Sequence, residues 1–448
     1  MIINNPIKKI VSDQKNGIFR GIYSACTAND LVIEAVLNRV IDTEDYVLIE
    51  ATANQVNQFG GYTGMVPADF RNFVFSIAAG TGFPKERILL GGDHLGPLTW
   101  KNEKAETAME KSAELIRQYV HAGFSKIHID TSMHLGDDVK TEKLKTSVIA
   151  RRAAFLCNIA EQAFNEIKDQ NRTLMRPVYV IGSEVPVPGG SQDEEETLEI
   201  TKPSDLEDTI ETFKKEFLSL NLQEAWDNII AVVVQPGVEF GDETIHEYSR
   251  ADAVELIQCL KKYPGLVFEG HSTDYQTADA LRKMVEDGIA ILKVGPALTF
   301  ALREALYALN SIENEIFRFN PEIELSNFTG ILDDVMAKHP ENWKNHYHGA
   351  PAKIRLSRKF SLSDRCRYYL PMKEVKDSLS IMLSNLKSTS IPLTLLSEYM
   401  PLQYNKIRYG LLTSTPEDLI RDRIINYIDD YLYATDPEMK MNRFGCSK

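Results

Sequence analysis

Two histidines of the 448-residue sequence follow acidic residues in glycine-containing segments that are otherwise apolar. Asp93 and His94 occur in Leu-Leu-Gly-Gly-Asp-His-Leu-Gly-Pro, and Glu269 and His271 occur in Phe-Glu-Gly-His-Ser. An imidazole nitrogen binds divalent metals, and a neighbouring carboxylate can transfer a proton. We therefore predict a metal site with His94 and His271 as ligands and with Asp93 and Glu269 as catalytic carboxylates. The alternative for each histidine is a structural role in a loop.

Four further acidic residues follow apolar segments. Glu50 ends Tyr-Val-Leu-Ile-Glu, and we expect it to contact a substrate. Asp130 ends Ile-His-Ile-Asp, and it either serves catalysis and substrate binding or caps the next helix. Glu184 is a candidate metal ligand or a loop residue in an ion pair, and Glu239, in a turn bounded by glycines, is a further candidate ligand. Buried carboxylates are costly unless they are paired or metal-bound, which favours a functional site.

A dense cluster of side-chain amides follows Glu50. The segment reads Ala-Thr-Ala-Asn-Gln-Val-Asn-Gln-Phe-Gly-Gly-Tyr-Thr-Gly-Met and contains Asn54, Gln55, Asn57 and Gln58. Amides donate and accept hydrogen bonds, so they can recognise the hydroxyl groups of a sugar. We expect these four residues to bind substrate, and the alternative is a polar loop without a ligand.

The other histidines and one basic segment carry weaker signals. His128 lies inside an apolar segment and His121 near a helix end, and we interpret both as structural, whereas His134 stays open. His346 and His348 are interpreted as surface residues. The basic segment could bind a phosphate or a carboxylate, although such a run is usually a solvated face. It contains Arg355, Arg358, Lys359, Arg365 and Arg367.

Short segments rich in Ile, Val or Leu alternate with amphipathic segments along the first 300 or so residues, as is typical of a (β/α)8 TIM barrel. This α/β fold places active sites at the carboxyl ends of its strands, where the acidic residues and histidines lie. We expect the barrel to span residues 1–315 and a mostly helical extension, packed on it, to span 316–448. The expected strands are Gly21–Thr27, Tyr46–Thr52, Arg87–Asp93, Lys126–Asp130, Val178–Glu184, Ile229–Gln235, Leu266–Gly270 and Ala290–Gly295.

The composition limits the possible partners and compartments. Hydrophobic residues make up 43% of the chain, and the formal net charge is −14. A surface this acidic repels phosphate backbones and anionic lipid, so we expect neither nucleic acid nor a membrane as partner. The five cysteines have no CxxC spacing, and the first residues lack the apolar region of a secretory signal. These features favour a cytoplasmic protein with reduced thiols.

With these residues in view, the chain resembles the Z-subunit family of class II D-tagatose-1,6-bisphosphate aldolase, which also includes tagatose 4-epimerase-like members. The amide segment described above is its most specific motif. The resemblance implies a TIM barrel and a subunit that supports a separate, catalytic class II aldolase subunit. It rests on Glu50–Met65, Gly91–Pro97, Ile181–Gly190, Gln235–Gly241, Phe268–Gln276, Lys293–Ala305 and Phe360–Tyr369.

A more distant likeness links the chain to catalytic class II aldolases. It implies that Asp93 transfers a proton and that His94 binds zinc, and it aligns Ile129–Ser132 and Glu184–Gly190 with two further motifs. The two other His-Gly ligand positions differ, because this chain has Phe240-Gly241 beside Glu239 and Glu269-Gly270-His271-Ser272. The likeness thus implies a rebuilt metal site formed by His94, His271, Glu239 and Glu269. Of the phosphate-binding segments, Gly241, Gly270 and Ser272 remain.

Two functions therefore remain open at the level of the sequence. One is a Z-type aldolase subunit in ketose catabolism, and the other is a stand-alone, metal-dependent ketose 4-epimerase that interconverts D-fructose and D-tagatose. Both imply a divalent metal (zinc, manganese or cobalt), which mixed histidine and carboxylate ligands suit about equally. Both imply a ketose or ketose phosphate as ligand and a homo-oligomer as the expected assembly.

Overall fold

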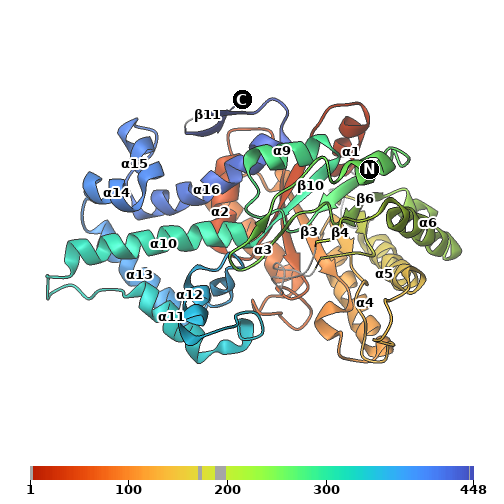
Figure 1. Cartoon of the computed structure of the whole chain (residues 1–448), viewed down its shortest axis with the longest axis horizontal. Coiled ribbons are helices and arrows are strands. Elements are labelled where there is room, and N and C mark those ends of the chain that lie inside the picture. Colours follow the sequence, from red (N-terminus) through yellow and green to blue (C-terminus); the bar gives the residue numbers. More distant parts are fainter. Residues whose placement is uncertain (1–3, 170–173, 187–197, 443, 448) are drawn as a thin grey trace.

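The computed structural model describes residues 4–169, 174–186, 198–442 and 444–447, apart from the side chain of Cys446. Eight parallel strands close into a barrel in the order β1-β10-β9-β6-β5-β4-β3-β2, which confirms the predicted TIM barrel (Figure 1). Most strands are buried along their whole length because helices cover the outside and side chains fill the inside. The barrel strands are β1 (Ile22–Cys26), β2 (Val47–Thr52), β3 (Ile88–Leu95), β4 (Lys126–Ile129), β5 (Val178–Ile181), β6 (Ile229–Val234), β9 (Val267–Gly270) and β10 (Ile289–Val294).

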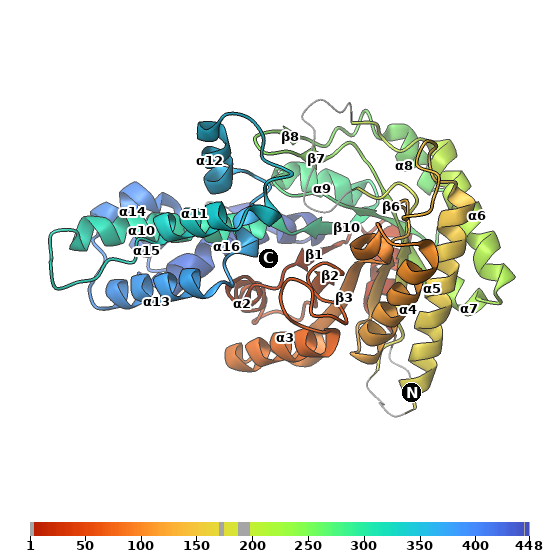
Figure 2. The ribbon, with the colours of Figure 1, turned by 90° about the horizontal axis from the view of Figure 1, so that it is seen from below.

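Helices follow the strands and surround the barrel (Figure 2). Several have recognisable starts: the side chain of Asn29 accepts a hydrogen bond from the Val32 N–H at the start of α2, and Thr277 caps α9 in the same way. Their apolar faces pack against the outside of the strands. The barrel helices are α2 (Asp30–Arg39), α3 (Pro67–Thr81), α4 (Ala105–His121), α5 (Thr146–Ile167), α6 (Pro203–Ser219), α7 (Gln223–Trp226), α8 (Val254–Leu260), α9 (Ala278–Glu286) and α10 (Pro296–Phe317).

The interior of the barrel has an apolar lower part. Leu48, Leu89, Val180 and other inward-facing residues form a cluster that is closed by the N-terminal helix α1 (Ile7–Lys15). Towards the carboxyl ends of the strands, the inward-facing positions change to charged and imidazole side chains. This apolar cluster excludes water at the amino ends of the strands. The polar groups therefore face the opposite end of the barrel, where the strands have their carboxyl ends.

A mostly helical extension follows α10 and packs on one side of the barrel (Figures 1 and 2). Its last helix, α16, is tied to the barrel by an Arg39–Asp429 ion pair of 2.5 Å and by a 2.9 Å hydrogen bond from the Tyr431 hydroxyl to the Thr273 carbonyl. The suggested domain boundary after residue 315 lies in the last turn of α10, and the division itself stays a prediction. The helices of the extension are α11 (Phe328–Lys338), α12 (Pro351–Phe360), α13 (Lys373–Lys387), α14 (Leu393–Tyr399), α15 (Pro401–Arg408) and α16 (Pro416–Thr435).

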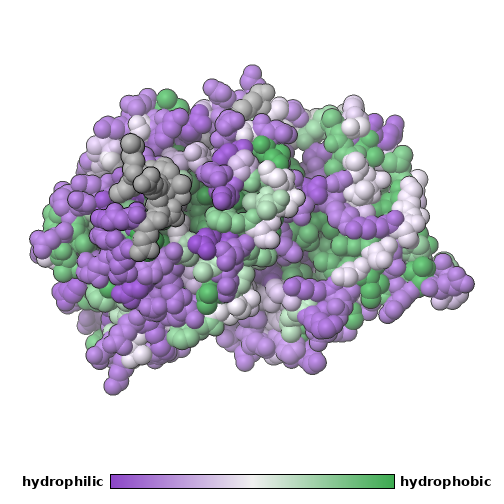
Figure 3. Space-filling model, turned by 180° about the vertical axis from the view of Figure 1, so that it is seen from behind, coloured by the Kyte–Doolittle hydropathy of each residue, from purple (hydrophilic) through white to green (hydrophobic). Residues whose placement is uncertain are grey.

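Two hairpins complete the fold. Strands β7 (Glu239–Phe240) and β8 (Ile245–His246) form one of them after β6, and β11 (Lys440–Asn442) and β12 (Gly445–Ser447) form the other near the C-terminus. Hydrophilic residues cover much of the face in Figure 3, and hydrophobic residues gather on it mainly towards the extension. No helix among the described residues is long and apolar enough to cross a membrane. Cys26, Cys157, Cys259 and Cys366 are free thiols.

Candidate active site

The barrel positions its polar residues through the two-residue period of its strands. On β4 and just beyond it, Lys126, His128 and Asp130 alternate with Ile127 and Ile129, so the polar side chains share one face. The isoleucines belong to the apolar layer between the strands and the helices. Glu50 on β2 and Glu269 on β9 reach the same interior, where both contact Lys126. Alternation thus directs one set of charged groups into the barrel.

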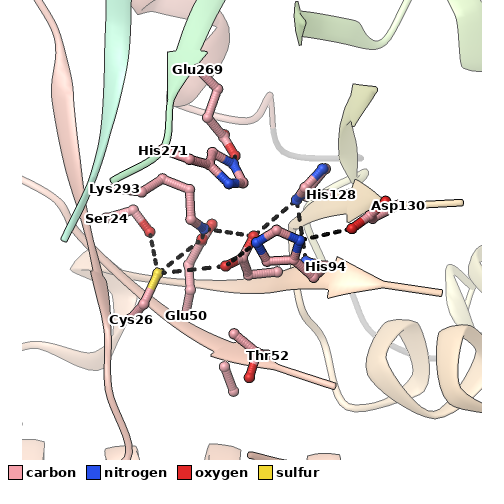
Figure 4. Close-up of polar contacts among 12 residues, drawn as sticks. Ser24, Cys26, Glu50, Thr52, His94, His128, Asp130, Glu269, His271 and Lys293 are labelled. Carbon is pink, nitrogen blue, oxygen red and sulfur yellow. Dashed lines mark hydrogen bonds and ion pairs between the residues drawn. The ribbon is translucent and has the colours of Figure 1, made fainter. Parts of the chain in front are cut away.

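Three imidazole rings meet at the upper end of this interior (Figure 4). The ring centroids of His94 and His128 are 5.0 Å apart, those of His94 and His271 are 4.9 Å apart, and those of His128 and His271 are 5.1 Å apart. Together with Asp93, each offers a ligand atom within 4.8 Å of the others, and all four residues are buried. This spacing allows one metal ion to contact several of them.

The hydrogen bonds of His94 leave one of its nitrogens for a metal. Its Nδ1 lies 2.8 Å from Oδ2 of Asp130. Burial alone would raise the pKa of Asp130, but the hydrogen bond and charge of His94 lower it to about 2. An ionised carboxylate only accepts hydrogen bonds, so Nδ1 carries a proton and Nε2 is the nitrogen left to face a metal. Such a carboxylate behind an imidazole is typical of metal-binding histidines.

His271 repeats this arrangement, since its Nε2 lies 3.0 Å from Glu269. His128 differs in part, because its Nδ1 lies 2.9 Å from Asp93 and also accepts a 3.2 Å hydrogen bond from the backbone N–H of His94. Burial raises the pKa of both carboxylates, but Lys126 and Lys293 outweigh it for Glu269, as His94 and Lys293 do for Asp93, and both pKa values fall below the usual range. His128 Nε2 is buried without a hydrogen-bond partner among the described residues. A buried nitrogen without a partner is costly, and a metal ion would satisfy it.

Two buried lysines form ion pairs with three of the buried carboxylates. Lys126 Nζ lies 2.7 Å from both Glu50 Oε1 and Glu269 Oε2, and Lys293 contacts Glu50 and, at 2.8 Å, Asp93. With Asp130, the four carboxylates and two ammonium groups leave two negative charges when the histidines are neutral. A divalent cation would balance them, and the imidazole-rich ligands suit zinc, manganese or cobalt better than calcium.

Local backbone features make this packing possible. A side chain at Gly91 on β3 would overlap the carboxylate of Glu50, so glycine is required there for Glu50 to reach Lys126. His94 has a φ of 46° and Ser272 a φ of 53°, conformations that non-glycine residues rarely adopt. Strain of this kind persists where the surrounding structure enforces it, often at functional sites.

A cavity opens above the histidines and connects them to the surface. Asp93, His94, His271 and Lys293 form its inner wall. The remaining walls combine residues from the ends of several barrel strands and the loops after them, residues at the start of α10 and two residues of the extension. They are Cys26, Thr52, Asn54, Gln55, Tyr62, Pro186, Phe240, Ser272, Asp274, Val294, Gly295, Pro296, Arg367 and Tyr368. The metal-type cluster is therefore accessible to a small polar molecule.

Comparisons with known proteins identify the family. The family model of the D-tagatose-1,6-bisphosphate aldolase subunit GatZ/KbaZ-like proteins matches residues 7–436. The chain belongs to this family. It is 48% identical over 433 residues to the D-tagatose-1,6-bisphosphate aldolase subunits GatZ of Salmonella dublin and Salmonella typhimurium, a match that covers 97% of this chain and all of each relative.

A solved structure shares the fold. The crystal structure of a Sinorhizobium meliloti protein, described as a probable tagatose 6 phosphate kinase, superposes with a TM-score of 0.84 at 42% identity. The alignment covers 93% of this chain and all of that chain. The Salmonella relatives and the Sinorhizobium protein thus have different names, and both names refer to a tagatose phosphate.

The structure brings together six of the residues predicted for the GatZ/KbaZ-like site. Asp93, His94 and His271 line the cavity, and Glu50, Asp130 and Glu269 lie directly behind them. The last three are engaged with a lysine or a histidine, so their contacts are those of positioning groups. The roles of all six stay predictions.

Two predicted metal ligands lie elsewhere. Glu184 forms a 2.8 Å ion pair with Lys143 and lines a separate cavity with Asp205 and Asp208. Residues 187–190 of its motif lie outside the described residues. Glu239 is buried on β7 next to Ser272, and burial raises its pKa to about 7. The group of possible ligands in the described chain includes neither glutamate.

The predicted substrate-binding residues divide in the same way. Asn54, Gln55 and Ser272 line the cavity. Asn57 instead accepts backbone hydrogen bonds from Phe59 and Gly61, and Gln58 donates to the Lys111 carbonyl. Gly241 forms a turn with Thr244, and Gly270 packs against Ile289. Asn57, Gln58, Gly241 and Gly270 therefore stabilise the loops around the cavity and do not line it.

The sequence interpretation missed several residues of the site. It treated His128 as structural, and it assigned no role to Lys126 or Lys293, which hold the buried carboxylates. The signal that could have found His128 is the Lys-Ile-His-Ile-Asp alternation, which is out of place in a strand buried on both faces. Arg367 and Tyr368 could not be placed at the barrel mouth from sequence, because they come from the distant extension.

Proposed function

We propose that this chain is a Z-type subunit of a D-tagatose-1,6-bisphosphate aldolase whose barrel keeps a divalent-metal site for a ketose. The family and its GatZ relatives support the subunit role. The observation that carries the metal site is the buried group of Asp93, His94, His128 and His271, in which each imidazole is oriented by a carboxylate. A subunit that served only as a scaffold would not need these costly buried charges.

In the proposed site, the metal would activate the ketose carbonyl group, and the side chains would hold the metal, accept a proton and bind hydroxyl groups. A bound divalent metal would act as a Lewis acid towards the carbonyl group of a ketose. His94, His128 and His271 would hold it, and Asp130 and Glu269 orient two of these rings. Asp93 faces the cavity, and His94 and Lys293 beside it keep it ionised, so Asp93 is placed to accept a hydroxyl proton. Asn54 and Gln55 would bind other hydroxyl groups of the sugar.

Metal content tests the site directly. We expect the purified protein, loaded with zinc or manganese and dialysed, to retain about one ion per chain. His128→Ala should lose most of this metal because Nε2 of His128 has no other partner. His121→Ala is the matched control, since His121 lies on the surface beside Glu166. Equal metal in the His128 variant and the parent protein would contradict the assignment.

The position of Asp93 in the cavity favours a second candidate function, that of a ketose 4-epimerase. Asp93 faces the cavity beside the metal group, as a stand-alone ketose 4-epimerase would require. In such a reaction, Asp93 accepts the proton of the C4 hydroxyl group while the C3–C4 bond breaks. Carbons C1–C3 then form an enediolate, and carbons C4–C6 form an aldehyde. Addition to the other face of the aldehyde re-forms the bond with inverted C4, and the proton returns to the C4 oxygen.

The two functions differ in what the chain does alone. The protein should be incubated with D-fructose, D-tagatose and their phosphates in the presence of manganese or zinc, with and without a catalytic class II aldolase subunit. Interconversion by the chain alone, abolished by a chelator and by Asp93→Asn, would support the epimerase. Cleavage of tagatose 1,6-bisphosphate that rises only in the combined sample would support the subunit role.

A further inference from the structure

The extension places a short, firmly held segment at the barrel mouth. Asp364, which precedes the 3-10 turn Arg365–Tyr368, accepts hydrogen bonds from Arg303 at 2.8 Å and from Thr299 at 2.7 Å, both on α10. On its other side, the Leu362 N–H donates to the Asp242 carbonyl in the β7–β8 turn. Asp364, Thr299 and Arg303 are buried, so these contacts fix the segment between α10 and the β7–β8 hairpin.

This segment brings Arg367 into the cavity, where its charge also acts on the Asp274 carboxylate. Arg367 is half-buried and donates to the carbonyls of Ser363 and Asp364 and, at 3.1 Å, to the hydroxyl of Tyr368. No carboxylate of the described residues forms an ion pair with it. The neighbouring Arg365 likewise donates to the Asn342 carbonyl and to His346. A partly buried guanidinium in this state gains from binding an anion.

The lysine of the cavity wall is already paired. Lys293 contacts Glu50 and Asp93, and the imidazoles of His94 and His271 lie against Asp130 and Glu269. Within the described part of the chain, Arg367 is thus the one cation of the wall that is left for a ligand.

A second potential anion site is filled by the protein itself. In (β/α)8 barrels, loops after the last two strands and a helix N-terminus often bind phosphate. Here the carboxylate of Asp274, a residue in the loop after β9, accepts hydrogen bonds from the backbone N–H groups of Gly295 at 3.0 Å and Ala297 at 2.8 Å, at the start of α10. Asp274 is buried and lines the cavity. A phosphate at this helix would have to displace a carboxylate of the same charge sign.

We propose that the cavity recognises a ketose with one anionic end group, a phosphate or a carboxylate, that Arg367 binds, and that Asp274 disfavours a second phosphate. The inference rests on the proposed ketose site. It assigns the extension a direct role in substrate choice, because the selecting cation comes from outside the barrel.

Binding measurements on the full-length protein test this inference without relying on turnover. Isothermal titration calorimetry with manganese present would compare D-tagatose, its 6-phosphate, its 1,6-bisphosphate and the 6-carboxylate analogue D-tagaturonate. We expect the 6-phosphate or the 6-carboxylate to bind at least tenfold more tightly than D-tagatose, as a charge-assisted bidentate contact provides. The tighter of the two identifies the end group. We expect the 1,6-bisphosphate to bind no more tightly than the 6-phosphate.

Variants separate the role of Arg367 from general electrostatics. Arg367→Gln should reduce the preference for the anionic sugar over D-tagatose to less than about threefold. Arg355→Gln, which removes the same charge from an exposed position of the extension, should keep the preference. A preference that persists in Arg367→Gln, or tighter binding of the bisphosphate, would overturn this inference alone. Binding of no ketose at all would contradict the proposed ketose site as well.

Discussion

Replacing Lys126 by methionine tests the central charge arrangement of the barrel. Lys126 lies 2.7 Å from Glu50 and 2.7 Å from Glu269, and the exposed fraction of all three side chains is zero. Methionine has a similar length but no charge, so Lys126→Met would leave Glu269 without a lysine and bring two buried carboxylates into direct repulsion. Removing one partner from a buried ion pair typically costs about 3–5 kcal/mol.

This loss of stability corresponds to a measurable decrease in the thermal unfolding midpoint. Unfolding entropies of about 2.1 cal/mol/K per residue give roughly 0.9 kcal/mol/K for a chain of 448 residues. The thermal midpoint of Lys126→Met should therefore fall by about 3–5 °C, measured by differential scanning calorimetry at pH 7.5 with a chelator present. The control Lys111→Met breaks a more exposed ion pair with Glu103 and should change the midpoint by no more than about 1 °C.

The pH dependence of the loss has a definite sign. The folded-state pKa values of Glu50 and Glu269 lie below their ordinary values, because Lys126 and Lys293 outweigh the effect of burial. Their stabilisation is thus present above the unfolded-state pKa of about 4.3 and is lost as the pH falls further. In Lys126→Met these carboxyls should take up protons more readily, so the difference between variant and parent should shrink at pH 4.5.

A second substitution decides whether repulsion is the cause. Glu50→Gln added to Lys126→Met removes one of the two facing carboxylates and should recover part of the lost midpoint. A midpoint of Lys126→Met within 1 °C of the parent protein would refute the reasoning, because it would mean that the two glutamates need no cation. A loss that Glu50→Gln does not reduce would assign the effect to packing instead.

Two further predictions concern neighbouring groups. Gly91→Ala should destabilise the protein by about 2–4 kcal/mol, because the alanine side chain would overlap the Glu50 carboxylate. The control Gly80→Ala has open space around it on α3 and should be neutral or slightly stabilising. The thermal midpoints of the two variants, measured by calorimetry, test this difference. Burial raises the pKa of Glu239 to about 7, so its ionisation destabilises the fold as the pH rises from about 4.5 to 7. Glu239→Gln should therefore gain about 1–3 kcal/mol over the parent protein at pH 8 but little at pH 5, and a gain independent of pH would contradict this.

The strands were predictable because burial on both faces leaves a strong signal. Segments such as Ile229–Val234 consist of apolar residues alone, and all eight expected strands occur within a few residues of their predicted bounds. The proximity of His94 and His271 was predictable for a related reason, since each stands with an acidic residue where an apolar run ends, whereas their role as metal ligands stays a prediction. A charged residue at such a point has no role in an apolar core, so its type and position indicate a site.

The remaining parts of the site depend on contacts that single segments do not encode. His128 lies between two isoleucines, and its role follows only once the strand faces are known. Asn57 has the same residue type as Asn54, but it lies in a buried turn and accepts hydrogen bonds from its own loop, whereas Asn54 lines the cavity. Arg367 belongs to a basic run, and only the contacts of Asp364 with α10 bring it to the cavity.

The electrostatic balance explains why these residues are better understood as a site than as a core. Four buried carboxylates and two buried lysines leave an excess of negative charge beside three imidazoles, one of which has a nitrogen without a partner. An apolar interior of the same volume would be at least as stable, so stability alone does not account for this arrangement. A divalent cation relieves the excess charge and the unsatisfied nitrogen together. The extension then places the positive charge of Arg367 at the mouth of the same cavity, so the proposed metal group and the proposed anion-binding arginine lie in different parts of it.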